Sequence, residues 1–451
     1  MRFPLIITTV ALACAVAALA DDPPRQNQAP TELRQTLPNG LETVVMPSAR
    51  AKWCVVLAGF RAGARDEDPE NAGCAQLAAR LLRKAACGLR DAGAADRELA
   101  ALGPRGEDAT PTGADAFHEL TYTWATVPEE KLGVALDVMR DRLTALHPTE
   151  AVLEEERQAL LSEPVKRETR AWNVLISLAF PGCSLGRPRL GNAATVTSLS
   201  LAQVDAWRAA HLRVDNAVFV IAGPKNAQAA LDLVAEKLGK VEKPASPLAA
   251  APPVPAGTKG LGRGKIDGPA GSRHVWIALR GPEPGSDDEA VFLAATFALK
   301  DRISTALQGK AHEATVHADA RSGAPALLVV SATPRPAAQL LDVEAGARGA
   351  VERVRTEAPP EMEKLKARVL RMLDGLTGSL DARLVGARDE AGALLDAVLD
   401  RALAAPLVAR REALSKKVAA LTTETFLARS KELLSEDRMT IVTIEPPAPP
   451  K

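Results

Sequence analysis

The sequence predicts an α+β protein of two related halves, each an antiparallel sheet covered by helices on one face. Three observations lead to this prediction: a Pro-rich segment divides the chain, hairpin and amphipathic patterns alternate along the first half, and one helix–strand pattern recurs in the second half. Hydrophobic residues make up 47% of the 451 positions, enough to bury sizeable cores. The 56 basic residues balance 56 acidic ones, which argues against a general nucleic-acid binder.

The N-terminal residues 1–20 are typical of a secretory signal peptide. Arg2 precedes a long apolar run that ends in Ala18-Leu19-Ala20, the small-residue pattern of a cleavage site. We therefore expect export to the periplasm or the extracellular space, removal of residues 1–20, and a mature chain without a membrane span. The alternative is an uncleaved anchor, because the run is about as long as the 17–25 residues that a span needs.

A Pro- and Ala-rich segment, residues 241–258, separates two longer stretches. Repeated prolines remove backbone donors and favour extended backbone, so this segment is predicted to be a linker. The two halves are then residues 32–240 and 259–446. The glycine-rich run at 260–265 is expected to continue the linker as a loop.

The first half begins with a predicted hairpin. Residues 32–45 alternate in polarity on either side of Asn39-Gly40, a strong hairpin signal. The further elements expected in this half, in chain order, are a strand at 53–57, a helix at 71–86, a strand at 118–127 and a helix at 129–143.

One helix–strand pattern occurs in both halves. Residues 196–200 (VTSLS) and 418–422 (VAALT) are offset by 222 positions, and the last residue of each is placed to cap a helix. The same offset relates the strands that are predicted to follow, at 217–221 and 440–443. A shared offset without gaps indicates an internal duplication.

Once Cys14 is removed with the signal peptide, Cys54, Cys74, Cys87 and Cys183 remain. Four thiols allow three pairings, and their spacing selects none of them. No C-x-x-C motif occurs, so the sequence supports neither a thiolate zinc site nor a redox motif. Buried free cysteines and a single structural disulfide both remain open.

Four short motifs follow one another through the first half: residues 36–41 (TLPNGL), 61–69 (RAGARDEDP), 156–163 (ERQALLSE) and 180–191 (FPGCSLGRPRLG). In this order they are similar to motifs of the inverted-zinc metallopeptidases of the insulinase, pitrilysin and mitochondrial processing peptidase family. The resemblance covers most of residues 32–240 and, more faintly, the second half. It implies that the two halves form a clam-shell arrangement.

The resemblance places the family's H-x-x-E-H motif on the predicted helix at 71–86, where all three functional residues are replaced. Gln76 and Arg80 fall at the two His positions, and Ala79 falls at the Glu position. A neutral amide is a poor zinc ligand, a guanidinium is a permanent cation, and alanine cannot take a proton from water. We therefore expect no catalytic residue and no metal at this motif, and no cofactor.

Two acidic positions of the family are retained, Glu156 and Glu163. The resemblance makes Glu163 the counterpart of the third zinc ligand, so Arg80 can supply a fixed positive charge where the ion's charge would be. The prediction is a guanidinium–carboxylate pair within about 4 Å. In the alternative arrangement, Arg80 points to solvent.

The second half of the family normally supplies an Arg and a Tyr that grip the substrate near the metal. The corresponding region is residues 301–316, which includes Arg302, and the Tyr position falls near Ala314. The chain's single tyrosine is Tyr122, in the first half. The Tyr that the resemblance would lead us to expect in the second half is therefore absent.

Two rival sites follow from individual residues. His118 together with Glu156 and Glu163 would form a relocated zinc site. Ser184 lies in a G-x-S-x-G pattern, but Pro181 precedes that pattern and Pro188 follows it, so we expect a loop rather than the nucleophile elbow of a serine hydrolase.

The function that the resemblance implies is that of an exported, catalytically inactive peptidase homologue. Such a chain would act as the non-catalytic partner of an active insulinase-like paralogue, or as a scaffold that binds peptide or unfolded polypeptide. The alternative is an active zinc-dependent metalloendopeptidase with a rebuilt metal site. A third possibility is a free-standing scaffold without a paralogue.

Overall fold

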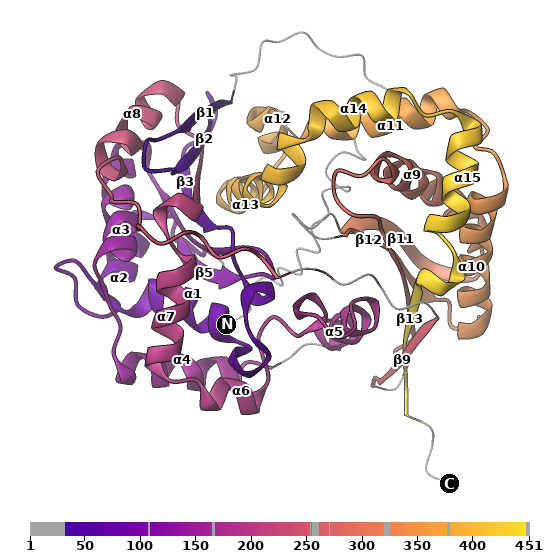
Figure 1. The fold of residues 1–451 in the computed structure, drawn as a ribbon, viewed down its shortest axis with the longest axis horizontal. Helices are drawn as coiled ribbons and strands as arrows, with labels where there is room; N and C mark the ends of the chain where they lie inside the picture. Colours follow the sequence, from indigo (N-terminus) through magenta and orange to yellow (C-terminus); the bar gives the residue numbers. More distant parts are fainter. Residues whose placement is uncertain are drawn as a thin grey trace.

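The computed structural model describes residues 32–106, 109–164, 167–252, 254, 261–269, 271–319, 325–376 and 379–447. The predicted signal peptide and part of the predicted linker lie outside these ranges. Figure 1 shows two α+β halves side by side, each with a sheet and helices packed against it. In the described part of the chain, no helix has both the length and the apolar character needed to cross a membrane.

The first half contains a six-stranded sheet in the order β1-β2-β8-β3-β6-β5. Its strands are β1 (Leu33–Thr36), β2 (Glu42–Met46), β3 (Cys54–Phe60), β5 (Thr112–Ala116), β6 (Thr121–Val127) and β8 (Ala217–Ala222). The predicted hairpin is confirmed, with Leu33 opposite Val45 and Thr36 opposite Glu42. Among the described residues of this sheet, β2 and β8 form the only parallel pair, and the other neighbouring strands are antiparallel.

The second half contains a five-stranded sheet in the order β11-β12-β10-β13-β9. Its strands are β9 (Gly262–Asp267), β10 (His274–Arg280), β11 (Ala311–Asp319), β12 (Leu327–Pro334) and β13 (Met439–Glu445). Read from the other edge, this order matches β2-β8-β3-β6-β5, and the parallel pair β9–β13 takes the place of β2–β8. The two halves are therefore related, as the repeated pattern predicts.

The expectation of a loop at residues 260–265 is wrong from Gly262 onward. Residues 262–267 form β9, which pairs in parallel with β13. The glycines serve close packing, because a Cβ added at Gly264 would lie 2.6 Å from Val174 and one at Gly262 would lie 3.4 Å from Leu178. A glycine-rich strand gives no β-propensity signal, which is why the sequence pattern indicated a loop.

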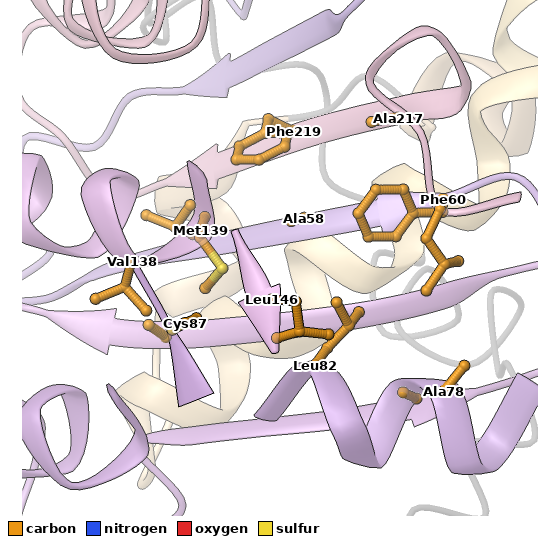
Figure 2. Close-up of a cluster of buried hydrophobic side chains, with 14 of the residues drawn as sticks. Ala58, Phe60, Ala78, Leu82, Cys87, Val138, Met139, Leu146, Ala217 and Phe219 are labelled. Carbon is orange, nitrogen blue, oxygen red and sulfur yellow. The ribbon is translucent and has the colours of Figure 1, made fainter. Parts of the chain in front are cut away.

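Helices cover the sheets as the amphipathic patterns predict. In Figure 2, Ala78 and Leu82 of one helix and Val138 and Met139 of another belong to one buried cluster that also contains Phe219 of a strand. The helices of the first half are α1 (Cys74–Lys84), α2 (Ala94–Leu102), α3 (Leu132–Thr144), α4 (Glu150–Ser162), α5 (Arg167–Ala179), α6 (Ala193–Ser198), α7 (Leu201–His211) and α8 (Ala227–Leu238). A small pair of strands, β4 (Ala86–Cys87) and β7 (Leu146–His147), lies between them.

The helices of the second half are α9 (Asp288–Ala306), α10 (Leu340–Thr356), α11 (Met362–Gly375), α12 (Leu380–Leu384), α13 (Glu390–Ala409), α14 (Arg411–Ala419) and α15 (Thr423–Leu433). Both predicted caps are present: the Ser200 side chain accepts a hydrogen bond from the amide of Gln203, and the Thr422 side chain accepts one from the amide of Thr425. The four cysteines in the part of the chain that the structure describes are free, so no disulfide joins these elements.

Two helices are exchanged between the halves. Helix α5 packs against β9, β10 and β13 of the second sheet, whereas α13 packs against β3, β6 and β8 of the first sheet (Figure 1). Each sheet is thus covered on both faces, and the expectation of helices on one face is wrong. An apolar helix pattern shows that a helix is buried but not which sheet it covers.

Candidate functional site

Helix α1 carries the three positions of the replaced motif. Gln76 and Arg80 are four residues apart and lie on one face of the helix. Ala78 and Leu82 point from another face into the core of the first half (Figure 2). Ala79 is fully buried and has no polar side-chain atom. The helix therefore presents an amide and a guanidinium where the motif would present two imidazoles.

A buried carboxyl group holds the N-terminus of α1. The Glu67 side chain accepts hydrogen bonds from the amides of Gly73 (3.0 Å) and Ala75 (2.7 Å), which have no partner within the helix. Burial raises the pKa of Glu67 to about 8, although these two amides and the charge of Arg187 act in the opposite direction. Sequence reasoning missed this role; the run of three acidic residues in the 61–69 motif was the available signal.

Arg80 pairs with both retained carboxylates. Its Nη1 lies 3.3 Å from Glu156 Oε2, and its Nη2 contacts Glu163, the residue that caps the C-terminus of α4. The side chains of Arg80 and Glu156 are 15% and 8% exposed, whereas that of Glu163 is 54% exposed. The predicted pair is confirmed, and the arrangement in which Arg80 points to solvent is wrong.

The residues present do not fit a zinc ion at this motif. Zinc sites in proteins use imidazole, thiolate or carboxylate ligands. Here both carboxylates are bound to a guanidinium, which is always charged and cannot coordinate a metal. A divalent cation would have to displace Arg80 and would then find no imidazole at position 76 or 80.

The relocated site is not assembled either. The Nε2 atom of His118 lies 2.9 Å from the carbonyl oxygen of Arg187, in the loop that follows α5. Within the ranges that the structure describes, no three residues among His, Cys, Asp and Glu are grouped so that they could hold a metal ion. The structure therefore does not bring His118, Glu156 and Glu163 together as a ligand set.

The 181–191 loop supplies a residue that sequence reasoning missed. Arg189 Nη1 donates to Asp115 Oδ1 (2.7 Å) and to the carbonyl oxygen of Ala116 (2.7 Å), both on β5. It also lies 3.4 Å from Oε1 of Gln76. The second arginine of the Gly-Arg-Pro-Arg sequence was the available signal, but nothing in the sequence indicated its partners.

Ser184 does not occupy a nucleophile elbow. It begins a single 3₁₀ turn, Ser184–Gly186, in the 181–191 loop, which follows helix α5 rather than a strand. A nucleophile elbow requires a strand that leads into the serine and a helix that leads out of it. The expectation of a loop is confirmed.

The Arg and Tyr positions of the second half contribute nothing to this site. Arg302 Nη2 lies 3.4 Å from the carbonyl oxygen of Ala358, within the second half. Ala314 lies on β11 and packs against the core of the second half. Tyr122 is buried in the first sheet, with its ring 5.8 Å from that of Trp124, and burial raises its pKa.

Comparisons with known proteins point to one peptidase family. A family model described as the peptidase M16 inactive domain matches residues 198–369. An uncharacterized zinc protease from Streptomyces coelicolor is 31% identical over 231 residues, which cover 49% of this chain and 48% of that protein. The matched part of this chain is thus similar to the M16 peptidase family. The match spans about half the length of the curated relative, so that protein's activity is not carried over to this chain.

Solved structures share the whole two-half fold. The periplasmic protease PqqL from Escherichia coli superposes with a TM-score of 0.73 at 14% identity, covering 93% of this chain and 48% of that one. A peptidase M16 inactive domain from Pseudomonas fluorescens gives a TM-score of 0.70 at 16% identity, covering 93% of this chain and 99% of that one. At these identities the likeness establishes the M16 clam-shell fold alone.

Proposed function

We propose that this protein is an exported, catalytically inactive member of the M16 peptidase family that acts as the non-catalytic subunit of a heterodimer with an active paralogue. The observation that carries the proposal is the pairing of Arg80 with Glu156 and Glu163. It puts a permanent cation at a position where the motif needs a neutral imidazole.

Two losses act on the same chemical step. A zinc peptidase uses the metal to lower the pKa of a bound water molecule and a carboxylate to take the proton. Losing a general base alone slows such a reaction by roughly 10²–10⁴-fold. In this chain the general base is replaced by Ala79, and the residues around it do not fit the metal. The retained fold can still bind a partner chain, a peptide or an unfolded polypeptide.

Export is part of the proposal. It is supported by the signal-peptide pattern of residues 1–20 and by the periplasmic location stated for PqqL. The test is the N-terminal sequence of protein recovered from the periplasm or the medium. A mature chain that begins at Asp21 supports export, whereas an intact chain that stays with the membrane contradicts it.

Inactivity is tested on the purified chain without a partner. An unstructured fluorogenic peptide is incubated with the protein, with and without a chelator, beside an intact H-x-x-E-H paralogue as the positive control. We expect no hydrolysis by this chain. Hydrolysis that stops when the chelator is added would show that the chain is an active zinc peptidase.

The partner role is tested by co-expression with that intact paralogue. We expect the two chains to co-purify and proteolysis to exceed that of the paralogue alone. If the chains do not associate, and the paralogue is equally active by itself, the free-standing scaffold is the better description.

A further inference from the structure

Strand β5 is an edge strand, and its end lies at the replaced motif. Its one neighbour in the six-stranded sheet is β6, so its other side faces away from the sheet. An open strand edge presents backbone N–H and C=O groups to which an extended peptide can add as a further strand.

At Ala116, the last residue of β5, both outward groups are already bonded. The amide of Ala116 donates to Gln76 Oε1 (3.2 Å), and its carbonyl oxygen accepts from Arg189 Nη1 (2.7 Å). In an antiparallel ladder, an added strand would bond the N–H and the C=O of the same residue. Gln76 and Arg189 therefore make the two bonds that a peptide backbone would make at this residue.

The two capping side chains are held in place by several contacts. Arg189 is bonded to Asp115 (2.7 Å) and lies over the ring of Phe117, with 5.6 Å between its guanidinium carbon and the ring centroid. The amide of Ala116 is also within 2.9 Å of Asp115 Oδ1. Gln76 is only 4% exposed, and its Oε1 lies 3.4 Å from Arg189 Nη1.

We propose that this contact is autoinhibitory: Gln76 and Arg189 close the end of β5 to an extended peptide, which pairs there only after Arg189 moves away. The inference deepens the proposed function, because it rests on the same site being non-catalytic. In this proposal Gln76, which falls at a His position of the family motif, bonds to the edge of β5 where a peptide backbone would otherwise pair.

The experiment compares the wild-type chain with the double variant Gln76→Ala/Arg189→Ala. Arg83→Ala is the matched control, because Arg83 is on the same helix but pairs with Asp96 (2.9 Å). The probe is a fluorescein-labelled casein peptide, followed by fluorescence anisotropy. We expect the double variant to bind it at least ~10-fold more tightly than the wild type, since main-chain pairing at the edge becomes available. Equal affinities in folded proteins would overturn the proposal.

Hydrogen exchange provides a second test that locates the binding. At a casein-peptide concentration equal to the dissociation constant of the double variant, exchange of residues 112–116 is expected to slow in the double variant and to stay unchanged in the wild type, because the end of the edge is already capped. Slowed exchange there in the wild type would overturn the autoinhibitory contact. Both readouts are independent of zinc and of hydrolysis, so a failure here is distinguishable from a failure of the proposed function.

Discussion

The two halves share one topology but differ at equivalent helices. Helix α1 follows β3 and precedes β5, and α9 follows β10 and precedes β11 at the matching place in the second half. Helix α1 carries Gln76 and Arg80, which reach three other segments of the first half. In α9 the buried polar residue is Thr296, whose hydroxyl bonds to the Phe292 carbonyl of its own helix. The fold therefore does not require a charge network at this position.

The largest expected difference concerns the ion pairs of the first half. Replacing Arg80 by Ala leaves Glu156 buried without a counter-charge, which we expect to lower the free energy of unfolding by about 3 kcal/mol. The matched substitution in the second half, Thr296→Val, is expected to cost about 1 kcal/mol or less. Urea denaturation of both variants measures the difference. Equal losses would show that the Arg80 pairs contribute no more than an ordinary helix residue.

The buried Glu67 carboxyl predicts a pH dependence of stability. Because its pKa is raised to about 8 in the folded state, that state binds the proton more tightly than the unfolded chain does. The resulting stabilisation is fully present below the unfolded pKa of about 4.3 and is lost as the pH rises through the folded value. Between pH 6 and pH 8 we expect a loss of about 2 kcal/mol.

The control for this pH dependence is Glu67→Gln, which cannot ionise. Arg187 and Asp66 remain in place near the side chain, so they affect both proteins alike. Urea denaturation at several pH values should show that the free energy of unfolding of the wild type decreases between pH 6 and pH 8, whereas that of the variant does not. If both proteins lose the same stability, another group is responsible for it.

A smaller change in stability tests whether α5 of the first half packs against β9 of the second half. Gly264→Ala places a Cβ 2.6 Å from Val174 of α5 and should cost about 1–2 kcal/mol by overpacking. Gly262→Ala is the matched control on the same strand, with its nearest contacts at 3.3 Å and 3.4 Å. Adding Val174→Ala to Gly264→Ala should restore part of the loss in thermal denaturation. If Val174→Ala restores none of the loss, the close approach of α5 to β9 is not the reason why a larger residue at position 264 destabilises the protein.

The sequence predicts the elements whose determining residues lie close together in the chain. The Asn39-Gly40 pattern predicts the β1–β2 hairpin, and Ser200 and Thr422 predict the start of two helices. The pairing of Arg80 with Glu163 was predictable because a resemblance placed both residues at one site.

Contacts between distant segments were not predictable. Arg189 and Gln76 are 113 positions apart, and no pattern in either segment indicates the other. The exchange of α5 and α13 is likewise set by how the halves pack together, because the apolar face of a helix does not specify which sheet covers it. Strand β9 was missed because its glycines are selected by packing against α5 rather than by strand propensity.

The zinc content of the purified chain tests the central claim most directly. After dialysis against zinc and removal of the unbound metal, inductively coupled plasma mass spectrometry should find far less than one zinc ion per chain in the wild type. Gln76→His/Ala79→Glu/Arg80→His should gain zinc, because it restores two imidazoles beside Glu163. About one zinc per wild-type chain, lost on Glu163→Gln, would contradict the account.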